Sequence, residues 1–379
     1  MYKKLLAIST LSGTVIGVGL FGLPYVTAQV GFLPMLFYFL VLTILIVNID
    51  LMYGEIAART KSNHRLIGYS AIYLGRGAKT ISYISSTIGL TGSLLVYIVV
   101  GGKFLASFLM PFLGGSVILY SLIFFLAGAW LIFAGSGPIS KTEFFSLGIF
   151  FAVLILVFVK SWPHLALENF LSTRLDLKNF FLPYGVILFS ISGTAVIPEI
   201  KEMLKNQAKS LKKIIVIGLI IPAVTYLLFI VSVYGITGAN TTEEGMVGLN
   251  LALGGGISML GFLFGVITTF TSFITLGITL KKSFNYDLGI SKKLSWLAAC
   301  FPALILYLLG LNDFIAIIGF LGAIAMGVDT IIIALTYLRA KKFGQRSPAY
   351  SLKMGRLGVS FIVFFALTGI IIELARNFY

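Results

Sequence analysis

The chain has 379 residues, of which 58% are hydrophobic and only 11% are charged. A soluble domain carries roughly 25% charged residues, so this composition excludes a soluble globular protein. The formal net charge of +15 would suit a nucleic-acid-binding protein only if the basic residues gathered on one face.

Apolar segments long enough to cross a bilayer core, which takes about 20 residues per helix, follow one another along the chain. Hydropathy and helix-breaking residues predict about eleven such spans and therefore an all-α polytopic membrane protein. In chain order, the predicted spans are 5–32, 34–58, 80–109, 116–134, 142–160, 181–200, 212–237, 251–280, 293–310, 314–338 and 357–377.

The basic residues alternate between successive loops. They gather at the N-terminus, at Lys141 and in the loops at 59–79, 201–213, 281–293 and 339–356, whereas the loops between these hold few. Because positive loops stay on the cytoplasmic side, we expect a cytoplasmic N-terminus and, with an odd number of spans, a C-terminus outside. The positive charge is thus a topology signal. The expected surroundings are a lipid bilayer, and we expect no nucleic acid partner.

The first span contains the stretch GTVIGVGLFGLP at 13–24, whose glycines have the G-x-G-x-x-G spacing of a dinucleotide-binding turn. That turn needs a preceding strand and an acidic residue about 20 positions further on. Here the stretch lies inside an apolar span, and the next acidic residue, Asp50, belongs to another span. Pro24 also argues against a regular helix opening at this point. The dinucleotide interpretation is therefore rejected.

We expect these glycines to interrupt the helix instead. Backbone freed from helical hydrogen bonds is tolerated at membrane depth only where protein or a polar cavity satisfies it. Freed N–H groups could then bind a carboxylate, and freed carbonyls could bind an ammonium group or a cation. The alternative is close helix packing through small residues, which we favour for Gly101 and Gly102.

A short sequence motif is repeated in two of the predicted spans. The triplet Ser-Gly-Thr occurs at 12–14 in span one and at 192–194 in span six, and both runs end in a proline, Pro24 and Pro198. Five spans separate the two triplets, so the copies would have opposite orientations, as in inverted-repeat transporters with interrupted helices. The expected organisation is a transporter core at 1–340, with repeat one at about 5–160 and repeat two at about 181–338, followed by an accessory eleventh helix in 341–379.

Three segments resemble one superfamily. GTVIGVGLFGLPYVTAQVGF in span one resembles the first helix of the amino acid–polyamine–organocation (APC) superfamily, especially its aromatic and hydroxy amino acid permeases. LPYGVILFSISGTAVIPEI in span six resembles the sixth helix of the same permeases and of the auxin/amino acid permease family, and TSFITLGITLKKSFNYDL in span eight resembles those bacterial permeases too. The resemblance implies a LeuT-like fold of two inverted five-helix repeats, with substrate bound between interrupted helices one and six.

The resemblance also implies a substrate site. In the family, N–H groups of interrupted helix one bind the substrate carboxylate, carbonyls of helices one and six bind its ammonium group, and side chains line the rest of the pocket. By position, the carboxylate site falls at Gly17, Val18 and Gly19, the ammonium site at Thr14, Phe189 and Ser192, and the side-chain pocket at Tyr97, Phe189 and Thr194. Thr194 stands where the aromatic permeases often have a histidine, which leaves the exact substrate open. These residues lack a clear charge, so a neutral amino acid is favoured, and the two aromatic rings suit a large apolar or aromatic one.

Members of the resembled family couple transport to sodium or to protons. A sodium-type site uses carbonyls of helix one and two adjacent hydroxyls of helix eight, and the resemblance places it at Gly13, Ile16, Thr271 and Ser272. Oxygen ligands suit a hard cation, but helix hydroxyls can also bond back to the preceding turn, and both interpretations stay open. Some proton-coupled relatives carry a lysine in helix five, and here no lysine lies between Lys141 and Lys160, which slightly favours sodium. No other cofactor is expected.

Four acidic residues are candidates for gating or proton transfer, because an ionisable group in a span is a functional-site hypothesis by default. Asp50 and Asp329 lie in the inner halves of spans two and ten. Either could carry a proton, line the inner exit or pair with a cytoplasmic lysine or arginine. Glu55 and Glu199 lie near inner helix ends, and we expect them to pair with basic residues such as those at 3–4 in an inner gate.

These features favour secondary active uptake of a neutral amino acid by ion-coupled symport through alternating access, in the cell membrane. The alternative is an exchanger or passive facilitator for another small amine or amino acid on the same fold. An enzyme is not expected, because the sequence has no metal-ligand cluster, no H-E-x-x-H, no G-x-S-x-G and no phosphate loop. The lone Cys300 excludes a disulfide framework. The sequence is silent on oligomeric state.

Overall fold

The computed structural model describes residues 2–135, 139–171, 179–204, 207–243, 245 and 255–378. Lys205, the side chain of Lys141, the start of the predicted eighth span and parts of the connections at 161–180 and 238–250 lie outside the described residues.

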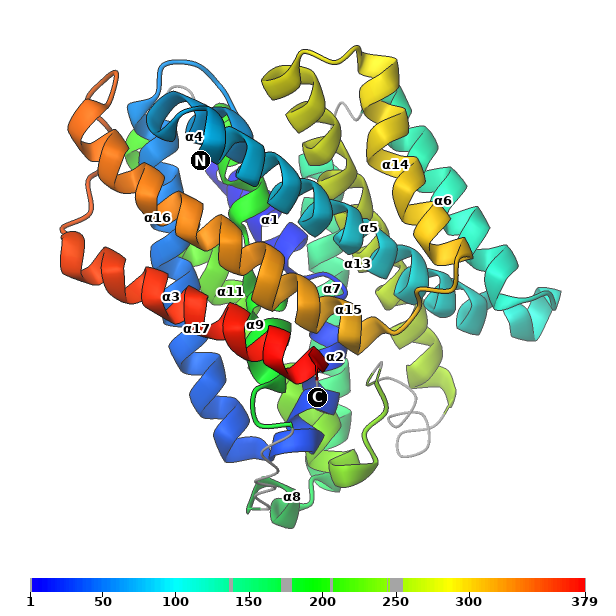
Figure 1. The fold of residues 1–379 in the computed structure, drawn as a ribbon. Coiled ribbons are helices and arrows are strands. Elements are labelled where there is room, and N and C mark those ends of the chain that lie inside the picture. Colours follow the sequence, from blue (N-terminus) through cyan, green and yellow to red (C-terminus); the bar gives the residue numbers. More distant parts are fainter. Residues whose placement is uncertain are drawn as a thin grey trace.

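The regular elements of the described chain are helices, as the composition predicts (Figure 1). The α-helices are α1 (Tyr2–Val15), α2 (Gly19–Val30), α3 (Phe32–Arg59), α4 (Leu66–Leu74), α5 (Arg76–Leu113), α6 (Val117–Ala134), α7 (Ile139–Ser161), α8 (Leu167–Leu171), α9 (Leu182–Ile191), α10 (Ile197–Met203), α11 (Leu211–Thr237), α13 (Gly255–Lys282), α14 (Lys292–Leu308), α15 (Phe314–Phe320), α16 (Met326–Phe343) and α17 (Arg356–Phe378). The short 3₁₀ turns are η1 (Trp162–His164), η2 (Thr194–Val196), η3 (Ala208–Ser210) and η4 (Gly238–Asn240), and the π-helical turns are η5 (Ser283–Asp287) and η6 (Leu321–Ala325).

Nine helical segments of the described chain are long and apolar enough to cross a membrane, and the bent pair α1–α2 raises the number to ten. The remaining predicted span, 293–310, corresponds to α14, whose 17 residues put it at the short end of the range for spanning helices.

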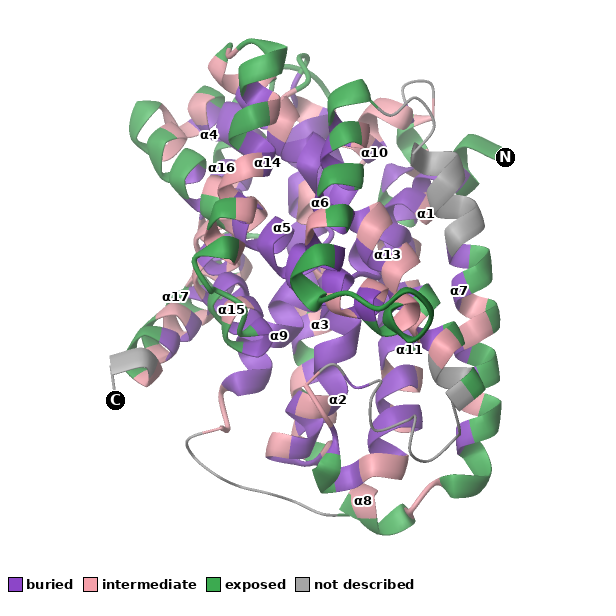
Figure 2. Ribbon diagram, turned by 90° about the vertical axis from the view of Figure 1, so that its right-hand side faces the viewer, coloured by how far each residue is buried: buried purple, intermediate pink, exposed green. Residues whose placement is uncertain are grey.

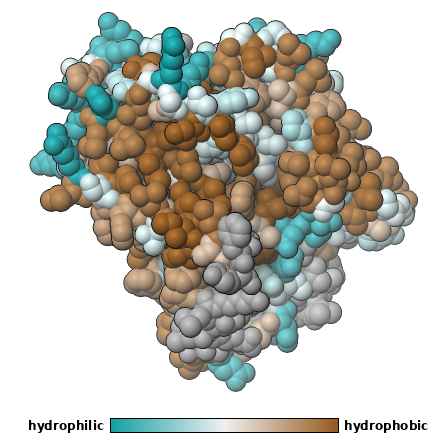
Figure 3. All heavy atoms as spheres, in the orientation of Figure 1, coloured by the Kyte–Doolittle hydropathy of each residue, from teal (hydrophilic) through white to brown (hydrophobic). Residues whose placement is uncertain are grey.

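The long helices run between two ends of the bundle (Figure 1). The N-terminus and α4 lie at one end, which we call the basic end because most loops rich in lysine and arginine gather there, and α8 lies at the opposite end. Large apolar side chains such as Phe37, Ile44, Trp130 and Phe361 are exposed on the outside. Figure 3 shows a broad hydrophobic surface, in brown, over the middle of one face, with hydrophilic residues above it. Such a surface is typical of contact with lipid.

The first span is interrupted as predicted. α1 ends at Val15, α2 begins at Gly19, and the two helices bend by 47° relative to each other. The expectation about Pro24 is wrong, because α2 continues through it to Val30. A proline withholds its own N–H and crowds the carbonyl four residues earlier, and here that residue is Leu20 in the first turn of α2, so the helix begins five residues before Pro24 and continues through it.

The sixth span is interrupted too. α9 ends at Ile191, and Ser192 and Gly193 are non-helical before η2 begins. The repeated triplet therefore marks both broken spans but not equivalent positions. At 192–194 it coincides with the break, whereas at 12–14 it stays helical and the break follows it.

Helix ten carries an interruption that the sequence did not predict, the π-helical turn η6 between α15 and α16. It lies where two helix backbones touch. A Cβ on Gly322 would sit 1.8 Å from the carbonyl oxygen of Gly185 in α9, and one on Gly185 would sit 2.1 Å from the carbonyl oxygen of Gly319. Only glycine permits this approach.

Candidate functional site

The two broken helices meet at one tyrosine of α11. The hydroxyl of Tyr226 lies 2.5 Å from the carbonyl oxygen of Val15, the last residue of α1, and 3.0 Å from that of Ser190 near the end of α9. Its side chain is fully buried. A buried tyrosine hydroxyl normally finds a hydrogen-bond partner, and this one serves carbonyls on both broken helices.

The glycines of the first break also allow close contact. A Cβ on Gly17 would lie 2.2 Å from the Tyr97 hydroxyl, and a Cβ on Gly19 would lie 2.7 Å from Cα of Ser190. The Tyr97 hydroxyl also hydrogen-bonds the backbone of Val18. Interruption and close packing, which the sequence presented as alternatives, therefore occur together here.

Packing alone explains the second pair of glycines, as expected. A Cβ on Gly102 would lie 2.0 Å from the Ser121 hydroxyl, and one on Gly101 would lie 2.5 Å from the ring of Phe124.

Asp50 of α3 holds the break in helix six. One carboxylate oxygen accepts a hydrogen bond from the Thr194 hydroxyl at 2.6 Å, and the other accepts one from the Gly193 amide at 3.1 Å. The Ser192 hydroxyl in turn donates to Thr194 at 3.1 Å. The partners of Asp50 are thus the unwound backbone and its hydroxyl rather than a cytoplasmic lysine or arginine.

A cavity joins the two breaks. Its empty space is about 1120 Å³, part of it open to solvent. The predicted substrate residues on its wall are Thr14, Gly19, Tyr97, Phe189, Ser192 and Thr194. Gly17 and Val18 are buried at the break beside it. The cavity continues past Tyr53 and Ser86 to Arg65 and Ser283 at the basic end.

Among the described residues on the other side of the breaks, aromatic rings and helix backbones pack closely. The ring of Phe21 in α2 packs edge-on against Phe104, Phe229 and Phe264, with centroid distances of 4.6, 5.8 and 6.1 Å. The backbone contact between α9 and the α15–η6 region closes the path on another side. Figure 2 shows the resulting buried centre, including α9 and much of α2 and α5. Within the described chain, the cavity therefore extends from the two breaks toward the basic end.

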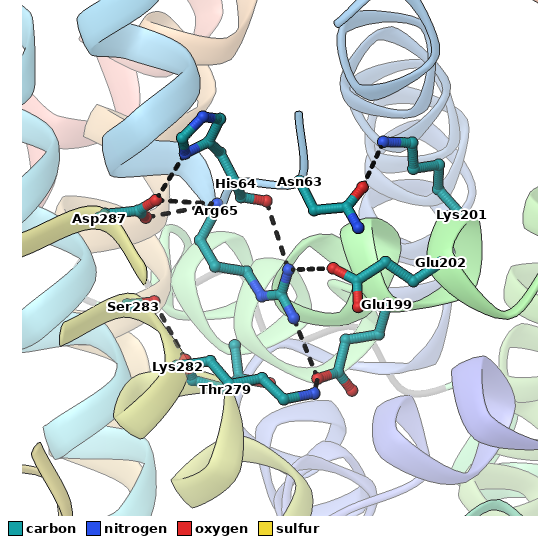
Figure 4. Close-up of polar contacts among 10 residues, drawn as sticks. All are labelled: Asn63, His64, Arg65, Glu199, Lys201, Glu202, Thr279, Lys282, Ser283 and Asp287. Carbon is teal, nitrogen blue, oxygen red and sulfur yellow. Dashed lines mark hydrogen bonds and ion pairs between the residues drawn. The ribbon is translucent and has the colours of Figure 1, made fainter. Parts of the chain in front are cut away.

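Four charged residues form a cluster at that end, the basic-end cluster of Arg65, Glu199, Glu202 and Lys282 (Figure 4). Arg65 pairs with Glu199 at 3.1 Å and with Glu202 at 2.9 Å, and Lys282 pairs with Glu199 as well. Burial alone lowers the pKa of Arg65, but the two carboxylates outweigh it, so the pKa is raised above its ordinary value. A raised pKa means that the pairing stabilises the fold at every pH below the ordinary arginine pKa, so the cluster keeps its cation throughout the physiological range.

Glu199 is therefore paired with basic residues, as predicted, but the expected partners, Lys3 and Lys4, were wrong. The partners come instead from the loop before α4 and from the end of α13. Charge sign at helix ends is visible in a sequence, whereas the loop that folds against each end is not.

Glu55 lies elsewhere. Its carboxylate pairs with Arg59 at 2.7 Å and accepts hydrogen bonds from the Ser351 hydroxyl at 3.0 Å and the Leu352 amide at 2.6 Å. The residues 344–355 between α16 and α17, which we call the strap, are thereby fastened to α3. The expected partnership with Lys3 or Lys4 is wrong here too, and Glu55 belongs to this attachment rather than to the cavity.

The predicted sodium site is brought together in part. The Ser272 hydroxyl lies 3.2 Å from the carbonyl oxygen of Gly13, and Ile16 is buried at the break. The Thr271 hydroxyl instead bonds back to the carbonyls of Ile267 and Thr268, both at 3.1 Å. The carbonyl and hydroxyl oxygens present fit a hard cation, with Thr271 able to join them only by turning away from its own helix.

Two functional contributions escaped sequence reasoning. Tyr226 is one of 17 tyrosines, and no motif around it was singled out. Arg65 and Glu202 carry charges in a basic loop and at a helix end, which normally indicates a solvated surface. A tyrosine in the middle of an otherwise apolar span was the available signal for the first, because its hydroxyl needs a buried partner.

Fold and site together define a polytopic membrane transporter with a cavity between two broken helices. The chain belongs to the tryptophan/tyrosine permease family, whose family model matches residues 2–373. It is therefore an amino acid permease and not an enzyme.

The chain is similar to two curated proteins over most of its length. It is 26% identical over 337 residues to "Tyrosine-specific transport system 1" of Haemophilus influenzae, with 82% of each chain covered. It is 21% identical over 374 residues to "Glutamine transporter 2" of Aliivibrio fischeri, with 94% of this chain and 95% of the relative covered.

The structure is also similar to the crystal structure of MhsT in complex with L-phenylalanine. The TM-score is 0.77, and 98% of both chains is covered at 15% sequence identity. At this identity the likeness shows the fold alone. It confirms the predicted LeuT-like fold.

Proposed function

We propose that this permease takes up a neutral amino acid with a large apolar or aromatic side chain, by ion-coupled symport through alternating access. The observation that carries the proposal is the convergence of two broken helices on one cavity, on whose wall lie Thr14, Gly19, Tyr97, Phe189, Ser192 and Thr194. The names of the relatives support the substrate class, since tyrosine, glutamine and phenylalanine are all neutral.

The chemistry of the wall suits such a substrate. The carboxylate is proposed to bind at Gly17, Val18 and Gly19, where α2 begins, because the positive end of a helix dipole favours an anion. In this structure the Gly17 amide donates to the Val15 carbonyl at 2.7 Å and the Val18 backbone bonds to Tyr97, so a bound carboxylate would replace these partners. Carbonyls near Thr14, Phe189 and Ser192 would take the ammonium group. The rings of Phe189 and Tyr97 would pack against an apolar or aromatic side chain.

The coupling ion is proposed to be sodium, bound by Gly13, Ile16, Thr271 and Ser272, with a proton as the alternative. The contact between Ser272 and Gly13 supports this site. A cavity that extends from the breaks toward the basic end, with the described rings around Phe21 packed on the other side, supports alternating access. We propose that the basic end faces the cytoplasm of the cell, following the distribution of positive charge.

The proposal is tested by uptake into proteoliposomes of labelled tyrosine, phenylalanine, tryptophan and glutamine, with an imposed sodium or proton gradient. Accumulation of at least one of them under a gradient is expected. If none accumulates under either gradient, symport is wrong, and exchange against internal substrate alone would favour an exchanger. Accumulation that follows protons and ignores sodium would contradict the sodium assignment.

A variant pair tests the pocket. Phe189→Ala should weaken binding of an aromatic substrate, because the ring lies on the cavity wall. Phe361→Ala is the matched control, since that ring is exposed on the outer face of α17. Equal affinities in the two variants would contradict the assignment of the pocket.

A further inference from the structure

Asp329 lies on the wall of the cavity, near the start of α16 and just after the π-helical turn η6, and the residue is partly exposed. One of its oxygens accepts a long hydrogen bond of 3.4 Å from the Ser86 hydroxyl. Its other oxygen, Oδ1, is buried and has no geometric hydrogen-bond partner among the described residues. The Ser85 hydroxyl lies near enough to interact with the carboxylate but donates to the carbonyl of Ala325 at 2.8 Å.

This environment contrasts with that of Asp50, which is fully buried. Both oxygens of Asp50 accept short hydrogen bonds from the break in helix six. A buried carboxylate with an unsatisfied oxygen is costly unless a proton, an ion or water completes it. A bound cation or proton would therefore stabilise Asp329. Its position on the wall makes it accessible from the cavity.

No basic side chain among the described residues pairs with Asp329. The ionisable groups that line the cavity besides Asp329 are Tyr53, Tyr97 and Arg65. The guanidinium of Arg65 is engaged by the carboxylates of the basic-end cluster.

The helices packed against α16 add no free charge at this depth. α3 contributes Tyr53, whose ring lies close enough to Asp329 to feel its charge, and α5 contributes only serine hydroxyls. α4 contributes the phenol of Tyr69, whose neighbouring charges are Arg65 and carboxylates other than Asp329. On α17, Arg376 is paired with Glu373 at 3.2 Å.

We infer that Asp329 binds the positive charge that is carried with the substrate, either a proton or one monovalent metal ion. The inference rests on the proposed coupled transport and adds a second cationic site, on the basic-end side of the substrate residues. π-Helical turns occur frequently at functional sites, and η6 ends directly before the turn that holds Asp329.

Binding at Asp329 would couple the ion to transport through charge alone. A negatively charged Asp329 in the apolar bundle resists closure of the cavity around it, because closure removes its remaining water. A loaded Asp329 is neutral as a unit and permits closure. The charged form of Asp329 thus favours the open cavity more strongly than the loaded form does. Coupling requires such a difference in binding between the open and closed states.

The test uses Asp329→Asn, which imitates the loaded form permanently. This variant should exchange external for internal substrate at a rate near that of the wild type but lose gradient-driven accumulation by about tenfold or more. The matched control is Asp313→Asn, because Asp313 caps α15 through the Ala316 amide at 2.9 Å and asparagine caps a helix equally well. It should keep both activities.

Two outcomes would overturn the inference. Accumulation by Asp329→Asn at the wild-type level would show that the charge is not needed. Loss of both exchange and accumulation in folded protein would show that Asp329 acts on the substrate or on the structure instead.

A direct binding measurement separates the two ions and stands apart from transport. If the ion is sodium, sodium chloride should raise the melting temperature of the wild type relative to choline chloride, and the shift should be smaller in Asp329→Asn, which keeps only the proposed site at Gly13 and Ser272. If it is a proton, a carboxyl infrared band that titrates in the wild type should disappear in that variant. Either signal, if Asp329→Asn reduces it and the wild type accumulates no amino acid, would defeat the proposed symport while keeping the site. A wild type with neither signal would defeat the site.

Discussion

Replacing Tyr226 by phenylalanine removes one hydroxyl and keeps the ring, so it isolates the contact between the two broken helices. In the wild type this hydroxyl lies 2.5 Å from the Val15 carbonyl oxygen and 3.0 Å from the Ser190 carbonyl oxygen. Without it, both carbonyls lose a buried donor. We expect the broken ends to lose their relative position, and the substrate to bind more weakly as a result.

The size of the effect follows from the cost of a buried polar group without a partner, about 1–3 kcal/mol. Part of that cost falls on the stability of the unliganded protein. If about 1–2 kcal/mol falls on the bound state, the dissociation constant of the substrate rises roughly 5- to 30-fold.

The assay is equilibrium binding of a labelled aromatic amino acid to purified protein, with melting temperature recorded alongside. Tyr234→Phe is the matched control, because Tyr234 lies on the same helix and its hydroxyl donates to the Asn169 carbonyl at 2.9 Å, away from the cavity. Both variants should melt at a lower temperature than the wild type, but only Tyr226→Phe should bind more weakly. Unchanged affinity in Tyr226→Phe, or an equal loss in both, would refute the reasoning.

Three further predictions concern other contacts. Asp50→Leu leaves an amide and a hydroxyl of the helix-six break without an acceptor and should weaken substrate binding by about tenfold; an unchanged dissociation constant would contradict this. Gly322→Ala would place a Cβ 1.8 Å from a carbonyl oxygen of α9 and should abolish the yield of monodisperse protein. Gly77→Ala is the control, because nothing lies within 4 Å of its Cβ, and it should purify like the wild type. Glu199→Gln should weaken the basic-end cluster and lower the free energy of opening it by about 1 kcal/mol. Labelling of a cysteine introduced at Ser283 should then be about fivefold faster. Equal labelling rates would show that the cluster does not close the cavity.

The fold was predictable because each span is a local property of the sequence. A run of apolar residues indicates a helix in lipid wherever it lies, and glycines beside a short polar triplet indicated where two of those helices break. Boundaries inside the breaks were less predictable. Pro24 is a strong helix breaker in general, yet α2 passes through it.

Contacts between distant segments were not predictable in the same way. Sequence reasoning placed Glu199 near a basic partner, but the choice between the N-terminal lysines and Arg65 depends on how a loop folds over the bundle. Pairing with a cytoplasmic lysine or arginine was one of three alternatives for Asp50, and the structure shows that it holds the break in helix six instead. Such partners are determined by packing between helices, which a single sequence does not reveal.

The glycine contact between α9 and helix ten bears on how the closed half of the bundle could open. Where interdigitated side chains separate, each must find a new rotamer and a new neighbour. Gly185, Gly319 and Gly322 instead present bare backbone to one another. The two helices can therefore separate at this contact without a change of rotamer at these three positions. They can return to the same register each time.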